Sequence, residues 1–420
     1  MHPRRRRNRS MLYRASGSAL VKYSNTKAQC RREISRYPEY IPATANVKTL
    51  RLLAIIEATS ITGPAKNLLE FARLAAAENV FTTIATFTRG DPENQFTRAV
   101  QALSATHPGI FLETIPERGP FDTAPIRALR ALAARVRPDV IQTHAVKSHF
   151  LVRSAGLPKS VPWVAFHHGY TWPTLKARAY NELDRWSLRA AKQVLTVSLP
   201  FRDQLIAVGV RPERIQVIHN AIPADWGAAQ REPFDTGIPA GRKVALIVGR
   251  LSREKDHLTL LDALHLLSPK IRPHLVIVGD GPEKPRIDGK IRQLGLGDFV
   301  TLTGHQSSAE RWYGIADVAV LSSLSEGSPN ALLEAMATRV PAVATAVGGI
   351  PEIVTDQATA LLVKPRDAQA MSAALARVLT EPKLAWRLAN NSHELIVDRY
   401  TPEARVRRLV SIYRGLSQPS

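Results

Sequence analysis

The segment GRLSREK, which begins at Gly249 and ends at Lys255, contains the residue types that bind a diphosphate. It follows an apolar run at 244–248 that predicts a β-strand, and the glycine lets the backbone turn closely at the strand end. Arg250 and Lys255 leave this strand end together. A guanidinium can bind two phosphate oxygens, and an ammonium adds a compact charge. The alternative is a solvated basic loop that its own acidic residues neutralise.

The segment SEGSPN at 325–330 follows another predicted strand, 318–321, and opens a predicted helix at 330–337. Pro329 suits the first helical position, and Ser328 is expected to cap the helix. The free backbone amides around Gly327–Asn330 and the helix dipole together predict an anion-binding site.

Two carboxylates accompany this helix start. Glu326 lies in the loop and Glu334 in the helix, and their spacing of eight residues does not stack them on one helical face. Carboxylates accept hydrogen bonds from sugar or ribose hydroxyls, so we expect the two to contact different parts of one ligand. Acidic residues near a helix N-terminus are also an ordinary feature that the dipole favours, and that interpretation stays open.

Weaker candidates lie in loops after further predicted strands. His305, in the segment Gly304–Gln306, could lie against a nucleobase, although a plain turn fits equally well. The glycine-containing segment 347–352 is interpreted as a structural turn. In the first half, Gly63 opens a helix after the strand at 50–56, and His168 follows the strand at 161–166. A structural or solvated role is the alternative for this histidine.

The elements that position these residues alternate between strands and helices. Short apolar, β-branched runs predict strands at 50–56, 80–87, 140–143, 161–166, 194–197, 215–218, 244–248, 275–278, 300–302, 318–321, 340–345 and 360–363. Amphipathic segments between them predict helices, for example at 65–78, 126–136, 258–267 and 368–379. This alternation indicates an α/β fold with two Rossmann-like, doubly wound domains. Clustered Pro and Gly at 223–242 predict the linker, and the strand ends of both domains would face one cleft.

Composition narrows the class of protein. The 420 residues carry a formal charge of +21, and residues 1–47 hold eleven basic and two acidic side chains. We interpret 1–47 as a basic, disordered extension; a transit peptide, or an over-extended start with Met11 as a later one, would also account for its charge. A single cysteine, Cys30, excludes a disulfide framework within one chain and favours a reducing compartment. No apolar run is long enough to span a bilayer.

Several common catalytic motifs are missing from the sequence. It contains no phosphate loop of the Walker type, no complete G-x-G-x-x-G, no G-x-S-x-G and no H-E-x-x-H motif. Gly279 begins a partial dinucleotide fingerprint, but Lys284 stands where its last glycine belongs. Without a Cys/His cluster or a D-x-D motif, no metal is expected, and the chemistry is predicted to be metal-independent and directed at an anionic substrate.

Taken together, these residues resemble glycosyltransferase family 4, the retaining nucleotide-sugar glycosyltransferases of the GT-B fold. The resemblance covers roughly residues 50–417. Its most specific part is the string EGSPNALLEAMA, preceded by ADVAVLSSLS, with Gly249, Arg250 and Lys255 upstream and VIHNAIP at 217–223. It implies an N-terminal acceptor domain at 48–223, a C-terminal donor domain at 224–397, and a last helix at 398–420 that crosses back to the N-terminal domain.

The resemblance also implies roles for individual residues. Arg250 and Lys255 would hold the donor diphosphate, Glu334 the ribose hydroxyls, and Glu326 and His168 the transferred sugar. Further donor contacts would come from Gly63, Gly249, His305, Gly327, Ser328, Pro329 and Asn330. The departures are Thr62 in place of a paired glycine, Lys66 in place of an acidic residue, and Asp256 in place of a glycine after Lys255.

The expected function is transfer of a sugar from a UDP- or GDP-sugar to a hydroxyl of a glycan or lipid-linked acceptor, in polysaccharide, lipopolysaccharide or glycolipid assembly. The alternatives are an epimerase or hydrolase of the same donor, a catalytically silent sugar-nucleotide scaffold, and a basic nucleic-acid or membrane binder. Nucleic acid is not expected as a partner, because no aromatic residues interleave with the basic ones. A cytoplasmic location is expected, and binding of anionic headgroups by Arg127, Arg130, Arg135 and Arg137 is a hypothesis.

Overall fold

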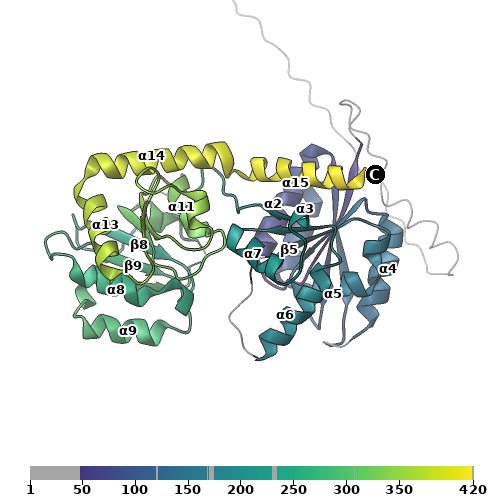
Figure 1. The fold of residues 1–420 in the computed structure, drawn as a ribbon, viewed down its shortest axis with the longest axis horizontal. Coiled ribbons are helices and arrows are strands. Elements are labelled where there is room, and N and C mark those ends of the chain that lie inside the picture. The colour runs from purple at the N-terminus through teal and green to yellow at the C-terminus, as the bar shows by residue number, and fades with distance from the viewer. Residues whose placement is uncertain are drawn as a thin grey trace, which may run out of the picture. The chain divides into compact units, whose positions relative to one another are not determined.

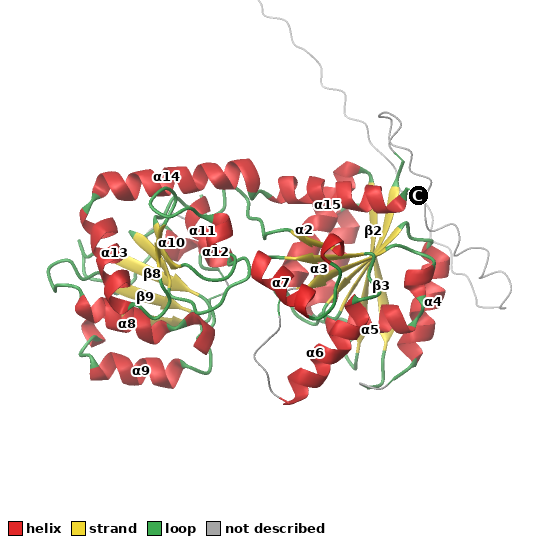
Figure 2. Cartoon of the chain, in the orientation of Figure 1, coloured by secondary structure: helices red, strands yellow, loops and turns green. Residues whose placement is uncertain are grey.

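The computed structural model describes residues 48–119, 122–167, 169, 175–228, 234–306 and 308–418, without the side chains of 175–179. The basic extension at 1–47 and His168 lie outside these residues. The described chain forms two α/β units, each with helices on both faces of a parallel sheet (Figures 1 and 2). Both sheets and their helix layers agree with the predicted fold class.

The first sheet has seven parallel strands in the order β3-β2-β1-β4-β5-β6-β7. Its strands are β1 (Leu50–Ile56), β2 (Val80–Thr88), β3 (Ile110–Pro116), β4 (Val140–His144), β5 (Trp163–His167), β6 (Gln193–Thr196) and β7 (Ile215–Val217). Its helices are α2 (Gly63–Ala75), α3 (Gln95–Thr106), α4 (Ala124–Val136), α5 (Val146–Ser154), α6 (Leu175–Leu188) and α7 (Leu199–Ala207), with 3-10 turns η2 (Ala76–Glu78), η3 (Leu157–Lys159) and η4 (Pro212–Arg214).

The second sheet has six parallel strands in the order β10-β9-β8-β11-β12-β13. Its strands are β8 (Val244–Val248), β9 (His274–Val278), β10 (Val300–Gly304), β11 (Val318–Leu321), β12 (Ala342–Thr345) and β13 (Leu361–Val363). The helices of this unit are α8 (His257–Leu266), α9 (Lys284–Gln293), α10 (Glu310–Tyr313), α11 (Asn330–Ala337), α12 (Ile350–Ile353), α13 (Ala368–Thr380) and α14 (Pro382–Arg399), with η5 (Arg253–Lys255) and η6 (Gly297–Phe299). The last helix, α15 (Pro402–Ser417), belongs to the first unit by its packing.

The strand order decides where a ligand can bind. Each sheet reverses its order once, between β1 and β4 in the first and between β8 and β11 in the second. Open parallel sheets bind ligands at the carboxyl ends of the strands beside such a reversal. The loops after β8 and β11 are the two charged segments that the sequence singled out.

Burial of apolar strands on both faces builds the cores. In β4 and β9 every residue is buried, as expected for central parallel strands covered by helices on both sides. Helix α15 packs its Val406, Leu409 and Val410 into the core of the first sheet. There Tyr413 Oη donates to Gln142 Oε1 at 2.6 Å, which anchors the end of the chain on β4.

Candidate active site

The loops after β8 and β11 are joined by an ion pair. Lys255 Nζ lies 2.6 Å from Glu326 Oε1, and Ser323 Oγ donates to the same oxygen at 2.6 Å. The backbones are joined too, because Leu324 N donates to Glu254 O and Ser322 Oγ donates to Lys255 O, both at 2.7 Å. The fold thus brings together two residues that lie 71 positions apart in the sequence. Lys255 is half-buried and Glu326 buried, so the pair is positioned rather than free to rotate in solvent.

Arg250 stands beside this pair as an exposed cation. Within the part of the chain that the structure describes, it forms no ion pair. The charge of Arg250 influences the pKa of Glu254. Burial would raise the pKa of Glu254, but hydrogen bonds and the charges of Lys255 and Arg250 outweigh burial and lower that pKa. The loop therefore offers one exposed guanidinium that no ion pair holds within the described residues.

A glycine turn after β9 supports the Arg250 loop from behind. A Cβ at Gly279 would lie 1.9 Å from Gly249 O, and the φ of Gly279 is +143°, so only glycine allows this contact. Leu251 N donates to Asp280 O at 2.9 Å and completes the contact. The partial fingerprint at Gly279 is therefore part of the scaffold that shapes the Arg250 loop.

A second glycine turn supports Glu326. Gly348 has a φ of +57°, and a Cβ there would lie 1.8 Å from Glu326 O. Gly349 N donates to the same carbonyl at 3.2 Å. This is the segment interpreted from the sequence as a structural turn. Its close backbone contact with Glu326 O fixes the position of the Glu326 loop.

The predicted cap of α11 is wrong. The helix begins at Asn330, Pro329 is its N-cap residue, and no side chain caps it. The Ser328 hydroxyl instead accepts a hydrogen bond from Asn220 N at 2.9 Å. Asn220 Nδ2 also donates to Ser328 O at 2.8 Å and to Asn330 Oδ1 at 2.9 Å. Asn220 thus competes for the capping hydroxyl; it stands in the VIHNAIP string, but sequence reasoning assigned it no role.

Glu334 lies partly buried on α11, where Tyr313 Oη donates to its Oε2 at 3.1 Å. Burial raises the pKa of Glu334, while the Tyr313 hydrogen bond and the charges of Lys66 and Lys255 oppose the shift. Tyr313 was missed by sequence reasoning, because it lies 21 residues upstream on a helix of one turn. A carboxylate with one fixed donor retains acceptor capacity for a ligand hydroxyl.

Two more predicted residues have no described link to this cluster. His305 is exposed in the loop after β10, and Gly63 is exposed at the start of α2. Among the described residues, no hydrogen bond or ion pair joins either to Lys255 or Glu326. Their roles remain predictions, as does that of His168.

A pocket of about 260 Å³ lies at the carboxyl ends of β1, β4 and β5. On its wall, His149 Nδ1 lies 2.7 Å from Asp184 Oδ1, and His167 Nδ1 lies 3.5 Å from Asp184 Oδ2. Burial would raise the pKa of Asp184, but the hydrogen bonds from both histidines outweigh it and hold the pKa well below its usual range. This cluster was not predicted from the sequence. The available signal was that Asp184 lies on the same side of α6 as Ser187 and Leu188, which are buried.

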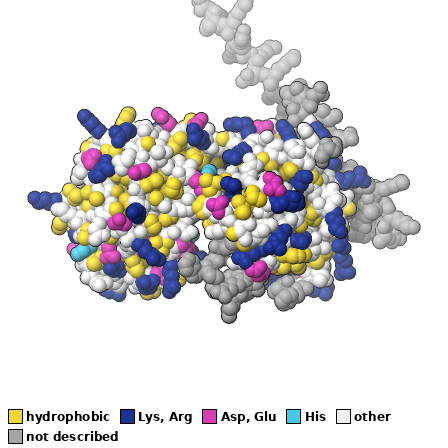
Figure 3. All heavy atoms as spheres, viewed as in Figure 1, with side chains coloured by type: hydrophobic (Ala, Val, Ile, Leu, Met, Phe, Trp, Pro, Cys, Tyr) yellow, Lys and Arg dark blue, Asp and Glu magenta, His cyan; other side chains and the backbone are white. Residues whose placement is uncertain are grey.

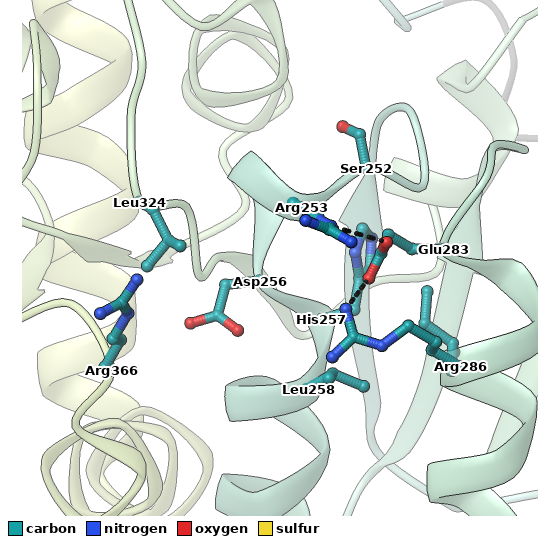
Figure 4. Close-up of a pocket in the computed structure, with 10 residues that line it drawn as sticks. Ser252, Arg253, Asp256, His257, Leu258, Glu283, Arg286, Leu324 and Arg366 are labelled. Carbon is teal, nitrogen blue, oxygen red and sulfur yellow. Dashed lines mark hydrogen bonds and ion pairs between the residues drawn. The ribbon is translucent and has the colours of Figure 1, made fainter. Parts of the chain in front are cut away.

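A second pocket, of about 400 Å³, lies beside η5 (Figure 4). Glu283 pairs there with both Arg253 and Arg286, at 3.4 and 2.6 Å. Asp256 adopts a left-handed φ of +45° and caps α8, and its carboxylate accepts from Thr259 Oγ1 at 2.7 Å. Arg250, Lys255 and Glu326 do not line this pocket. In the described part of the chain, no group of three or more His, Cys, Asp or Glu side chains could hold a metal ion.

Comparison with known proteins decides the family. Residues 61–226 match the family model described as Glycosyltransferase Family 4, and residues 229–395 match the one described as Glycosyl transferases group 1. The chain belongs to glycosyltransferase family 4. The match holds along most of the chain, since the two matched ranges adjoin and together contain every described strand except β1.

Relatives in this family include the alpha-D-kanosaminyltransferase of Streptomyces kanamyceticus, 29% identical over 306 residues, which are 69% of this chain and 79% of the relative. The UDP-Gal:alpha-D-GlcNAc-diphosphoundecaprenol alpha-1,3-galactosyltransferase of Escherichia coli is 26% identical over 307 residues, 70% of this chain and 79% of that protein. Among solved structures, Anabaena HepE in complex with UDP superposes with a TM-score of 0.73 and 19% identity, over 87% of this chain and 100% of that one. The family 4 fold is GT-B, and this chain is a glycosyltransferase.

No helix in the described ranges has both the length and the apolar character needed to cross a bilayer.

Proposed function

We propose that this family 4 glycosyltransferase transfers a sugar from a nucleoside-diphosphate sugar to a hydroxyl acceptor, with retention at the anomeric carbon and without a metal ion. The observation that carries the proposal is the Lys255–Glu326 pair, 2.6 Å long, at the strand-order reversal, with Arg250 exposed beside it. One ammonium and one guanidinium at this edge supply the charge that a diphosphate needs.

The donor would contact both charged loops. Arg250 and Lys255 would bind the diphosphate, and Glu326, whose carboxylate already fixes Lys255, would face the transferred sugar. Glu334 would accept hydrogen bonds from the ribose, with Tyr313 holding its carboxylate in place. Backbone amides around Gly327–Asn330 and the loop at His305 would complete the donor site.

Leaving-group stabilisation is the main catalytic effect in this proposal. Negative charge grows on the nucleoside diphosphate as the anomeric bond breaks, and preorganised cations stabilise it most in the transition state. The Glu326 carboxylate is held by Lys255 and Ser323 and would be a poor nucleophile, so a front-face substitution would account for retention. In this route the departing phosphate takes the proton of the acceptor hydroxyl.

The acceptor class is proposed from the relatives. The Escherichia coli relative is named for a sugar linked to diphosphoundecaprenol, and the Streptomyces relative for the transfer of kanosamine. We propose a glycan or lipid-linked sugar as acceptor, which would bind near the pocket at β1, β4 and β5.

The proposal is tested with UDP-, GDP- and ADP-glucose in the presence of EDTA. Water serves as the acceptor, release of nucleoside diphosphate is the readout, and proton NMR identifies the anomer of glucose that forms first. The proposal expects one donor to be cleaved with the α-anomer formed first, and cleavage to be lost in Arg250→Ala. An exposed arginine on α14, changed in Arg387→Gln, is the matched control.

The products separate this proposal from inverting, metal-dependent and epimerase reactions. β-Glucose formed first would refute retention, and cleavage only after added Mg²⁺ or Mn²⁺ would refute metal independence. An epimerised nucleotide sugar would favour the epimerase alternative. No reaction and no nucleotide binding with any donor would refute the proposal as a whole.

A further inference from the structure

The surface of α4 and α5 is basic and almost free of acidic residues. From Ala124 to Ser160 the chain has seven basic residues and one acidic residue, Asp139, and Asp139 is paired with Arg51 at 3.4 Å. Figure 3 shows Lys and Arg side chains gathered, with hydrophobic side chains among them, where Figure 1 places α5. A surface of one charge sign attracts an anionic partner.

The structure changes which residues of this surface are available. Of the α4 residues that the sequence suggested, Arg135 is paired with Glu113 at 2.6 Å. Arg130 donates to Ala155 O at 2.8 Å, which places its charge at the C-terminal end of α5. Arg130 therefore lies at the same end of α5 as Arg153, which belongs to the last turn of that helix.

An exposed tryptophan lies beside Arg153. Trp186 of α6 is 43% exposed, and the guanidinium of Arg153 stacks 3.7 Å from its ring centroid. Phe150 of α5 lies 6.0 Å from the same ring. A tryptophan held between an arginine and an aromatic ring presents an apolar body with a polar rim at the surface.

Arg185, next to Trp186, is paired with Glu182, but two other cations near the ring have no acidic partner in the described ranges. Neither Arg153 nor Arg189, which directly follows α6, forms an ion pair with any residue in the described ranges. Arg189 instead donates to Val208 O at 3.0 Å. Burial, and to a smaller extent the like charge of Arg189, lower the pKa of Arg153. Two cations of one sign on this face attract an anionic partner.

We propose that Arg130, Arg153, Arg189 and Trp186, called here the Trp186 surface, bind the surface of an anionic lipid bilayer. The arginines would bind phosphate groups of the lipids, each contributing to the attraction. Trp186 would lie at the headgroup level, where tryptophan is favoured at membranes. Electrostatic attraction and an interfacial ring would together strengthen binding to an anionic bilayer.

A bilayer fits this surface better than a nucleic acid does. Single strands bind along grooves in which several aromatic rings stack successive bases. Here one exposed tryptophan lies on a helical face, and its stacking surface is already covered by Arg153. A flat array of lipid phosphates requires only the charges and one ring that inserts at its edge.

The test is flotation of the full chain with vesicles of phosphatidylcholine, alone or with one third phosphatidylglycerol. We expect binding to the anionic vesicles only, weakened by salt. The double variant Arg153→Gln, Arg189→Gln should bind about 30-fold more weakly, at about a factor of five for each lost charge. Trp186→Ala should also weaken binding, and the double variant Arg153→Lys, Arg189→Lys should restore most of it.

Helix α14 provides the matched control. Trp386 is 71% exposed, more than Trp186, and Arg387 is its exposed neighbour. Trp386→Ala and Arg387→Gln should leave vesicle binding unchanged. Circular dichroism checks that each variant is folded, and nucleotide binding is measured separately, because this inference does not depend on the proposed donor.

Several results would overturn the proposal. One is equal binding to neutral and anionic vesicles, and another is binding that the Trp186 surface variants do not change. A loss in Trp386→Ala equal to that in Trp186→Ala would place the contact elsewhere. Binding of a single-stranded oligonucleotide that these variants abolish, without vesicle binding, would assign the surface to nucleic acid instead.

Discussion

Asp256 offers the sharpest test of how the Lys255 loop is built. This residue directly follows Lys255, has a φ of +45° and caps α8 through its side chain. The family resemblance expects glycine at this position, and the left-handed backbone explains why. Aspartate is among the few non-glycine residues that adopt this conformation readily, and its carboxylate adds the cap.

The two functions of Asp256 can be separated by Asp256→Gly and Asp256→Ala. Alanine loses the cap, which costs about 1 kcal/mol, while glycine loses only a few tenths. Alanine also keeps the left-handed strain of about 1–2 kcal/mol that glycine avoids. Part of the advantage of glycine is offset, because the greater entropy of its unfolded chain costs about 0.5–1 kcal/mol of stability relative to alanine. Alanine should therefore be less stable than glycine by about 1.5 kcal/mol, the balance of these contributions.

Asp367 is the matched control. It caps α13 through a 2.8 Å bond from Ala370 N, but its φ is −107°, so no left-handed strain is present. Helices α8 and α13 pack in the same core, so both sites report on the same folding unit. At Asp367, glycine and alanine should differ by less than about 0.5 kcal/mol, since only the cap and the flexibility of glycine contribute.

The assay is urea unfolding followed by circular dichroism. The free energies of unfolding of the four variants are compared with one common slope m against urea concentration. The prediction would be wrong if the glycine and alanine variants differed in free energy of unfolding by the same amount at Asp256 as at Asp367. It would mean that the left-handed turn after Lys255 contributes nothing to stability.

Three further predictions concern the charged loops. Arg250→Ala and Lys255→Ala should each lower turnover of the preferred donor by about 100-fold, as loss of a transition-state charge partner does; retention of activity within a few-fold would contradict the proposed role. Gly348→Ala should weaken nucleotide binding in calorimetry, because its Cβ would lie 1.8 Å from Glu326 O, whereas Gly415→Ala, with nothing within 4 Å, should not. Burial raises the pKa of Glu334 and the Tyr313 hydrogen bond lowers it, so nucleotide affinity should fall as the pH drops through that pKa and the carboxylate is protonated. Tyr313→Phe should move this fall to higher pH, and identical pH profiles would contradict the assignment.

Much of the fold could be predicted because central parallel strands are apolar throughout. The predicted strands at 50–56, 244–248 and 318–321 agree with β1, β8 and β11, and the predicted helix at 330–337 agrees with α11. Strand β3 was missed, because Glu113 and Thr114 interrupt its apolar pattern. It lies at the edge of its sheet, where one side of the strand needs no apolar cover.

The sequence named residues of the candidate site but not the contacts between them. The sequence marked Lys255 and Glu326 as loop residues, and only the pairing order of β8 and β11 brings them within 2.6 Å. The expected Ser328 cap failed because Pro329 takes the N-cap position, and the Ser328 hydroxyl accepts instead from Asn220, more than a hundred residues away. The buried contacts of Asp184 with His149 and His167 depend on the packing of α5 and α6 against β5, which local periodicity does not encode.

Calorimetric titration of the full chain with UDP, GDP and ADP in EDTA tests the central claim most directly. We expect one nucleotide to bind without metal, and Glu334→Ala to weaken this binding while Glu394→Ala, which changes an exposed carboxylate on α14, does not. The absence of binding by all three nucleotides, or equal binding by both variants, would contradict the assignment of these loops as the donor site.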